Sequence, residues 1–169
     1  MASIIMGVDP GSLITGFGVI AVEGDHLRHL AHGVIDLRKD ELPLLQRLPL
    51  IGRAFRQLLE KYEPDEVVIE AIFLGKNPDS AFKLGHARGV LAYEAGLREI
   101  PVLEYATRVV KKSLTGNGGS DKIQVEFYLR HLLRLDIIKP LDASDALAMA
   151  CHHAITGRRA SLFANAVEL

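Results

Sequence analysis

The chain has 169 residues, of which 49% are hydrophobic, and a formal net charge of -1; this composition excludes a disordered chain, and the length suits one folded domain. No apolar run approaches the roughly 20 residues that span a bilayer, and the short apolar stretch at 4–8 lacks the basic residues that begin a secretory signal. The single cysteine, Cys151, excludes an internal disulfide bond, and these features together predict a cytoplasmic protein.

The first half of the chain predicts an antiparallel meander followed by one long helix. Apolar, β-branched and glycine-spaced segments separated by turn signals predict three strands, at 4–9, 16–23 and 26–37. From Leu44 to Tyr62, apolar residues then recur every three or four positions, which is typical of a helix that buries one side. Pro64 ends this helix.

The second half alternates strands and helices. Short apolar segments predict strands at 66–70 and 101–104. The other segments predict a helix at 80–98, two helices separated by a loop at 115–120, and an alanine-rich helix at 141–156. This order predicts an α/β domain whose five-stranded mixed sheet has helices on both faces. We expect the domain to span residues 1–157 and the remaining 158–169 to be a mobile tail.

The helix expected at 80–98 carries small residues four positions apart, namely Ala81, Gly85 and Gly89, followed at the same spacing by Tyr93. Small side chains let another backbone approach closely. The stripe is therefore a candidate contact with a second subunit, and close packing on the chain's own sheet explains it equally well.

Two acidic residues, Asp9 and Glu70, end apolar strands. Ligand sites in open α/β sheets gather at the carboxyl ends of strands, so each is a candidate site residue, although an acid at a strand end is also common elsewhere. Asp142 and Asp145 lie three residues apart near a helix start, which puts both on one face. Helix N-termini favour acids in any protein, but the apolar residues that follow this pair predict that it faces the protein body, where unpaired acids are costly.

If these four carboxylates meet in one cleft, they repel one another, and divalent cations would relieve the repulsion. Oxygen ligands suit Mg²⁺ or Mn²⁺ better than Zn²⁺. Two such ions can activate a water and stabilise the leaving oxygen of a phosphodiester. His152 and His153 do not argue for zinc, because adjacent residues on a helix point in different directions.

Positive charge concentrates in the middle of the chain, where ten Lys or Arg residues between Lys76 and Arg134 outnumber six acids. Local potential decides whether a nucleic acid binds, although a mixed solvated surface has the same composition. Segment 73–78 combines an aromatic residue, a base and an amide, which suits stacking on a nucleobase and contact with a phosphate. Glycines between Lys111 and Lys122 expose backbone N–H groups to phosphates, or they belong to a flexible surface loop.

Several of these segments form an ordered series over about residues 2–155. They are Gly7-Val8-Asp9-Pro10-Gly11, Thr15-Gly16-Phe17-Gly18-Val19, Ile69-Glu70 with Phe73, Lys76-Asn77-Pro78-Asp79-Ser80-Ala81, Leu84-Gly85-His86-Ala87-Arg88-Gly89, Glu104-Tyr105-Ala106, Lys122 and Asp142-Ala143-Ser144-Asp145-Ala146-Leu147-Ala148. Any one segment is weak evidence, but the ordered set is highly specific. It resembles the RuvC family of Holliday junction resolvases, which have an RNase H-like fold.

The resemblance implies a homodimer, with the helix around 80–98 as the expected contact, that cuts a four-way DNA junction at two symmetric positions during recombination and repair. It also implies two Mg²⁺ ions per active site, for which Mn²⁺ substitutes, and cooperation with the RuvA–RuvB branch-migration complex. In this hydrolysis Asp9 is expected to bridge the two ions, Glu70 to hold one and the Asp142–Asp145 pair the other, while Lys122 stabilises charge on the phosphate. The residues expected to bind DNA are Phe73, Lys76, Asn77, Lys83, Arg88, Lys111, Lys112 and Lys122.

Two positions depart from the family pattern. Ala71 follows the strand-ending glutamate where the family often has an amide or an acid, which removes one contact behind the expected ligands. Asp142 stands where some relatives carry histidine, and an aspartate there adds negative charge.

Three other functions stay open on the sequence alone. Asp9-Pro10-Gly11 followed by Thr15-Gly16 resembles the phosphate loop of actin-like kinases and ATPases, which share the core fold but usually need two such domains. A non-catalytic junction-binding module is disfavoured by the presence of all four acids. A related nuclease acting on RNA is the third, because fold alone does not choose the substrate.

Overall fold

The computed structural model describes residues 2–71 and 77–167. Strands β1 (Ser3–Asp9), β2 (Ile14–Glu23) and β3 (His26–Asp36) form an antiparallel meander. Strands β4 (Glu66–Glu70) and β5 (Val102–Tyr105) extend the sheet from β1 in parallel. The strand order is β3-β2-β1-β4-β5, so the expected five-stranded mixed sheet is confirmed.

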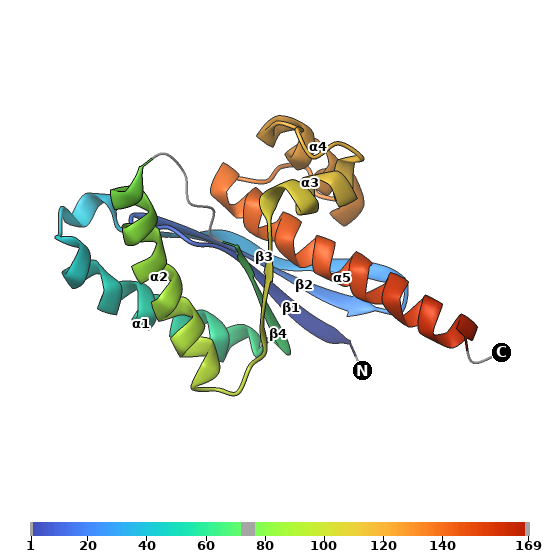
Figure 1. Cartoon of the computed structure of the whole chain (residues 1–169), viewed down its shortest axis with the longest axis horizontal. Coiled ribbons are helices and arrows are strands. Elements are labelled where there is room, and N and C mark those ends of the chain that lie inside the picture. The colour runs from blue at the N-terminus through green and yellow to red at the C-terminus, as the bar shows by residue number, and fades with distance from the viewer. Residues whose placement is uncertain (1, 72–76, 168–169) are drawn as a thin grey trace.

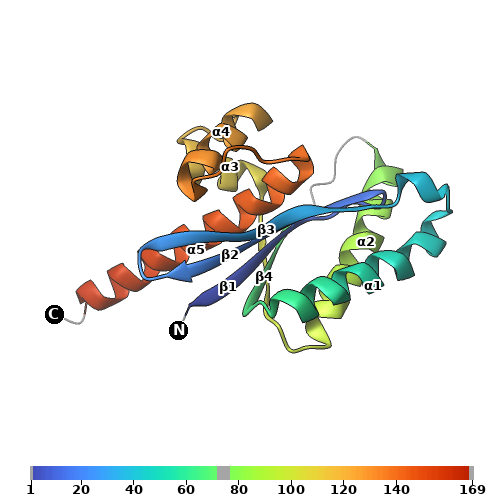
Figure 2. The same ribbon diagram turned by 180° about the vertical axis from the view of Figure 1, so that it is seen from behind.

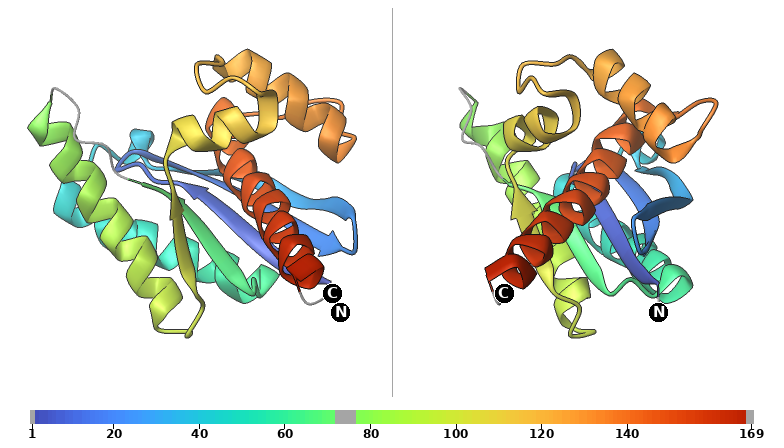
Figure 3. Two further views of the ribbon diagram at one scale, coloured as in Figure 1. Left: turned by 45° about the vertical axis from the view of Figure 1, so that its right-hand side comes forward. Right: turned by 90° about the vertical axis from the view of Figure 1, so that its right-hand side faces the viewer.

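Helices cover both faces of this sheet. After a short 3-10 turn at Arg38–Asp40, α1 (Leu44–Tyr62) and α2 (Pro78–Gly96) lie side by side on one face (Figure 1). Helix α5 (Leu141–Val167) runs along the other face, with α3 (Thr107–Thr115) and α4 (Lys122–Leu133) packed around its first half (Figures 2 and 3). The fold therefore has three layers, with the sheet in the middle.

The sheet separates two hydrophobic cores because successive strand residues point to opposite faces. Ile5, Ile20 and Val68 pack against α3, α4 and α5. Their neighbours Met6 and Val67 pack against α1 and α2 on the other face. A sheet that is buried on both faces needs apolar residues throughout its central strands. For this reason β1 and β4 consist largely of consecutive apolar residues in the sequence.

Glycines in the first two strands let α5 lie directly on the sheet. Gly7 and Gly18 are opposite each other in the β1–β2 register. A Cβ atom on Gly7 would lie 2.0 Å from the backbone oxygen of Ala146, and one on Gly18 would lie 2.6 Å from the side chain of Leu147. The backbone of α5 therefore approaches these strands more closely than side chains would permit, and its first turns lie near the end of β1.

Two helix boundaries differ from those expected. Helix α2 begins at Pro78 rather than at residue 80, because the Asn77 side chain accepts a hydrogen bond from the backbone N–H of Ser80 and caps the helix there. Helix α5 does not end near Thr156 but continues to Val167. Gly157 costs a helix only about 1 kcal/mol, and the alanine-rich sequence on both sides is compatible with continuation. The mobility of residues 158–169 and the domain boundary at 157 stay predictions.

None of the helices in the described part of the chain combines the length and the apolar character needed to cross a membrane.

Candidate metal centre

Two strands and one helix bring the four acids to one end of the sheet. Asp9 ends β1 and Glu70 ends β4, and these strands are parallel neighbours whose last paired residues are Val8 and Ile69. Asp142 and Asp145 lie in the first two turns of α5, which packs on β1 and β2. Parallel pairing explains the proximity of the two strand ends, and the packing of α5 explains the proximity of the helix pair.

The pKa of Asp9 reflects its burial and the charged side chains near it. The pKa of Asp9 is raised from 3.8 to about 8, chiefly by burial and then by the negative charges of Glu70 and Asp145 and a hydrogen bond with Glu70. The positive charge of Lys122 opposes this increase. Asp9 is therefore protonated at neutral pH in the metal-free protein, because a third carboxylate charge is unfavourable there.

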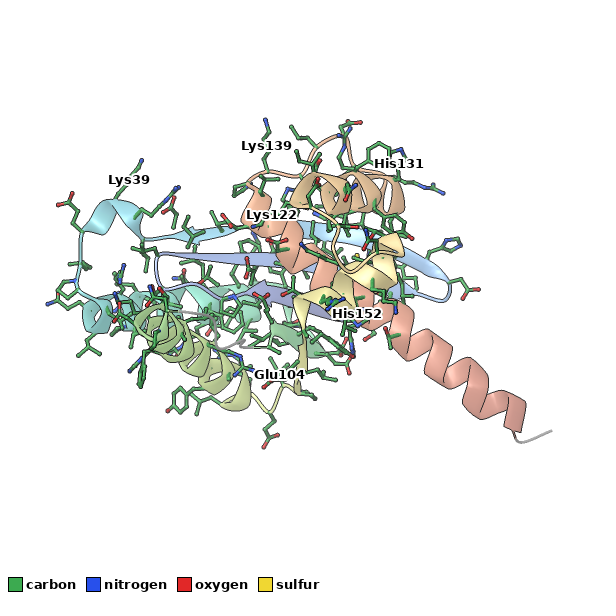
Figure 4. All side chains as sticks on the ribbon, turned by 45° about the horizontal axis from the view of Figure 1, so that its top comes forward. Lys39, Glu104, Lys122, His131, Lys139 and His152 are labelled. Carbon is green, nitrogen blue, oxygen red and sulfur yellow. The ribbon has the colours of Figure 1, made fainter. Side chains whose placement is uncertain are left out.

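Lys122 supplies the positive charge of this cluster. Its ammonium lies 2.6 Å from Asp145 Oδ2 and 3.8 Å from Asp142 Oδ1. The hydrogen bond to Asp145 is the main reason why the pKa of Lys122 is raised. Lys122 is the first residue of α4, whose start is fixed by a capping box between Asp121 and Gln124. Figure 4 shows Lys122 over the first turns of α5, whereas Lys39 and Lys139 point outward.

The four acids are not equivalent. Glu70 and Asp145 both act electrostatically on Asp9. The side chain of Asp142 is more exposed than that of Asp145 and joins the group through its ion pair with Lys122. Sequence reasoning grouped the two helix acids as one pair, and the structure shows that Asp145 is the more closely integrated.

The chemistry of this cluster fits divalent cations. Among the described residues, no three His, Cys, Asp or Glu side chains already stand close enough together to hold a metal ion. Instead, Lys122 binds Asp145 and a proton is held on Asp9. Both are positive charges that compensate carboxylates, and a hard cation with oxygen ligands would compensate the same carboxylates.

Glu70 is held by two residues whose contacts with it the sequence alone did not indicate. The hydroxyl of Thr107, at the start of α3, donates a hydrogen bond to Glu70 Oε1. Arg88 Nε donates to the backbone oxygen of Glu70 at 3.2 Å, and the same guanidinium forms an ion pair with Glu104. Both contacts cross between elements that are far apart in sequence, so no spacing pattern could have identified them.

The residues expected to bind DNA have varied surroundings. Phe73 and Lys76 lie outside the described residues. Asn77 caps α2, and Lys83 on that helix pairs with Asp79 at 2.5 Å. Lys111 donates to the backbone oxygen of Ser120 at 2.8 Å, which ties α3 to the following loop, and Lys112 is exposed. The side chain of Arg88 is only 19% exposed, so its contacts with β4 and β5 occupy a group that was expected to face DNA.

The two adjacent histidines contact different partners, as their spacing predicted. Buried His152 lies 2.5 Å from the Ser113 hydroxyl. His153 bridges the Tyr105 hydroxyl at 2.8 Å and Glu66 at 2.9 Å.

Ala71 is the residue after Glu70 at which the sequence departs from the family pattern. Its backbone N–H donates to the backbone oxygen of Tyr105, and it lines a cavity of about 160 Å³ together with Glu70.

Comparison with known proteins identifies the family of the chain. Residues 5–153 match the family model described as crossover junction endodeoxyribonuclease RuvC. The crossover junction endodeoxyribonuclease RuvC of Bdellovibrio bacteriovorus is 55% identical over 169 residues, which cover all of both chains. The protein with the same description from Vibrio campbellii is 45% identical over 156 residues, which cover 92% of this chain and 89% of the relative.

Comparison with solved structures supports the same family assignment. Thermus thermophilus RuvC in complex with a Holliday junction substrate matches with a TM-score of 0.86 and 31% identity, covering 94% of this chain and 96% of that one. The yeast mitochondrial Holliday junction resolvase Ydc2 has a TM-score of 0.65 at 14% identity, covering 90% of this chain and 78% of that one, which shows a shared fold. The chain therefore belongs to the RuvC family of crossover junction endodeoxyribonucleases, which are Holliday junction resolvases with an RNase H-like fold.

Proposed function

We propose that Asp9, Glu70, Asp142 and Asp145 form the catalytic centre of this resolvase and hold two Mg²⁺ ions, for which Mn²⁺ can substitute. The observation that carries the proposal is the position of Asp9 at the end of β1, where burial and the neighbouring carboxylates of Glu70 and Asp145 raise its pKa. Such an excess of partly buried acid is unfavourable for stability and is typical of sites that bind a cation or transfer a proton.

Each residue has a distinct task in this proposal. When bound, the ions supply a Lewis acid and an activated water for hydrolysis of the phosphodiester. Asp9, after giving its proton to solvent, would help to hold both ions, Glu70 would help to hold one, and the Asp142–Asp145 pair would help to hold the other. The ammonium of Lys122, which pairs with Asp145, would stabilise the charge that develops on the scissile phosphate.

The proposed substrate is a four-way DNA junction, cut at two symmetric positions to leave 5′-phosphate and 3′-hydroxyl ends. Support comes from the Thermus thermophilus relative, which was solved with a Holliday junction substrate. In this proposal DNA contacts extend from the catalytic centre to Phe73, Lys76, Asn77, Lys83, Lys111 and Lys112. We also propose that the enzyme acts in the cytoplasm with a RuvA–RuvB branch-migration complex, which would move the junction to the cutting site.

Symmetric cutting requires two copies of the site, and we propose that α2 joins them. Helix α2 buries Ala87 and Leu91 in its own core. Its outer side exposes Phe82 by 72% and Tyr93 by 63%, and a Cβ atom on Gly89 would meet nothing within 4 Å. Large exposed aromatic residues beside a small residue are the features that a second helix could cover.

The test of the catalytic centre is Asp9→Asn, assayed on a synthetic four-way junction in Mg²⁺, in Mn²⁺ and with EDTA. We expect no measurable cutting, because the amide supplies neither the charge nor the second oxygen ligand. Asp25→Asn, in the exposed β2–β3 turn, is the matched control and should cut like the wild type. Normal cutting by Asp9→Asn would overturn the assignment, and preferential cutting of an RNA–DNA hybrid by the wild type would overturn the substrate.

A further inference from the structure

Glu70 receives a hydrogen bond from a residue on a separate element, and we propose that this residue, Thr107, is a positioning residue that fixes the Glu70 carboxylate for metal binding. The inference rests on the proposed metal centre and adds to it a residue outside the four acids. The contact itself runs from the Thr107 hydroxyl to Glu70 Oε1.

The backbone explains why Thr107 reaches Glu70. Glu70 is paired with Tyr105 in the β4–β5 register, and the two strands stay together beyond it because the Ala71 N–H donates to the Tyr105 oxygen at 2.9 Å. Thr107 follows two residues later and begins α3. The turn from β5 into α3 therefore brings the Thr107 hydroxyl to the Glu70 side chain, and the β-branched side chain of threonine has few rotamers with which to leave that position.

The residue that follows Glu70 makes the Thr107 contact important for the orientation of the Glu70 carboxylate. Ala71 follows Glu70, and its methyl group cannot hydrogen-bond to a carboxylate. The Glu70 side chain also contacts Asp9, but Asp9 is itself a proposed ligand whose oxygens would be needed by the cations. Thr107 is a neighbour outside the four acids that can hold one oxygen of Glu70 in place while the other oxygen serves as a ligand.

The backbone of Glu70 is fixed separately. Arg88 Nε donates to the Glu70 oxygen at 3.2 Å, and its guanidinium pairs with Glu104. With the main chain held by Arg88, removal of the Thr107 hydroxyl should leave the strand in place and release the carboxylate alone. This separation makes a test of side-chain positioning feasible.

The experiment compares Thr107→Val, which keeps the shape and removes the hydroxyl, with Thr107→Ser, which keeps the hydroxyl. Mn²⁺ binding to the full-length protein without DNA is measured by titration calorimetry, and the Mg²⁺ concentration for half-maximal junction cutting is measured in parallel. We expect Thr107→Val to bind Mn²⁺ about tenfold more weakly and to need correspondingly more Mg²⁺, because loss of an outer partner of a ligand typically weakens metal affinity by roughly 10–100-fold. Thr107→Ser should restore most of both.

Thr156→Val is the matched control, because the Thr156 hydroxyl donates to the His152 backbone oxygen within α5 at 2.8 Å, well away from the carboxylates. It should bind Mn²⁺ like the wild type. If Thr107→Val does not fold, Thr107→Ala removes the same hydroxyl without adding a methyl group and carries the same expectation. Wild-type Mn²⁺ affinity in a folded variant that lacks this hydroxyl would overturn the role of Thr107, whereas a wild type that neither binds Mn²⁺ nor cuts would refute the metal centre itself.

Discussion

Gly16 lies against the first turn of α5 so closely that a Cβ atom on it would be 2.2 Å from the backbone oxygen of Asp142. Gly16 is also directly opposite Asp9 in the β1–β2 register. One glycine therefore sits between the acid that ends β1 and the helix that carries the other two acids. Because the near atoms of Asp142 and Ala143 belong to the backbone, no side chain can move aside to make room for a larger residue.

Gly16→Ala should consequently displace the start of α5 and separate Asp145 from Asp9. We expect a loss of about 1–3 kcal/mol in the free energy of unfolding, as for other overpacked interiors, and a large fall in junction cutting. Denaturant unfolding and a cleavage assay would measure the two effects. Gly157→Ala, where a Cβ atom meets nothing within 4 Å, is the control: it should cut like the wild type and be no less stable, because alanine favours a helix over glycine. Unchanged cutting by Gly16→Ala would mean that α5 tolerates a shift.

Lys122 should matter for the reaction more than for the fold. Its ammonium pairs with Asp145 at 2.6 Å, and half of its side chain is exposed, so the ion pair itself contributes little to stability. Lys122→Ala should reduce the cutting rate at saturating Mg²⁺ by roughly 100-fold or more, as for loss of other charge-stabilising groups at active sites. Single-turnover cutting with prebound junction would show this. Lys61→Ala at the end of α1 should have no effect, and an equal loss in both variants would argue against a specific role for Lys122.

The sequence predicted the sheet well, because the strands depend on local patterns. Strand β4 and helix α1 were predicted at their observed bounds, since an apolar run with turn signals and a regular apolar stripe are each visible in a short window. The positions of Asp9 and Glu70 at strand ends made them candidate site residues, and the metal-ligand hypothesis followed from the repulsion among the four carboxylates. That these two acids and Asp145 meet was inferred from the family resemblance, because spacing alone cannot bring β1, β4 and α5 together.

The supporting contacts could not be predicted in this way. Thr107 reaches Glu70 across 37 residues, and the His153–Glu66 contact spans 87. Side chains of these types are common, and their roles depend on which elements pack together. Arg88 shows the same limit, since its basic character predicted DNA contact but could not indicate that the fold also holds it against Glu70 and Glu104.

The raised pKa of Asp9 makes metal-free stability depend on pH. Between its ordinary value of 3.8 and the folded value of about 8, Asp9 is protonated in the folded state and ionised in the unfolded state. The folded state therefore binds more protons, and the free energy of unfolding should fall as the pH rises through this range. Denaturant unfolding in EDTA at several pH values would measure the fall, and Asp9→Asn, which is uncharged throughout, should show a weaker one. An identical pH dependence in both proteins would contradict the expectation.

The same proton should compete with metal. At a pH below about 8, binding of Mg²⁺ must displace the proton on Asp9. The Mg²⁺ concentration that gives half-maximal cutting should therefore decrease as the pH rises from about 6 to 8. A titration of Mg²⁺ at fixed junction concentration would test this, and a concentration that does not change with pH would show that Asp9 is already ionised in the working enzyme.

Arg88 and Lys83 lie on the same helix, and variants of the two should distinguish a residue that stabilises the fold from one that contacts DNA. Arg88→Gln removes a charged donor from the Glu70 backbone oxygen and should lower the free energy of unfolding by roughly 1–3 kcal/mol. Lys83→Gln should leave stability unchanged, because its pair with Asp79 is exposed. It should instead weaken junction binding and reduce the slope of log affinity against log salt by about one. A reduced slope for Arg88→Gln would instead show that Arg88 also contacts phosphate.

The proposed dimer contact on the exposed side of α2 makes a prediction about subunit association. Tyr93 is 63% exposed on this helix and borders a groove of about 550 Å³ shared with α1. Tyr93→Glu would place a charge in the centre of a contact made by two copies of this surface, so each charge would face its equivalent or an apolar neighbour. We expect sedimentation to show monomers at concentrations where the wild type is a dimer, and the junction to be nicked on one strand at a time. Phe127→Glu, an equally accessible aromatic position on α4, should remain dimeric. A Tyr93→Glu protein that still sediments as a dimer and makes paired cuts would assign the interface to another surface.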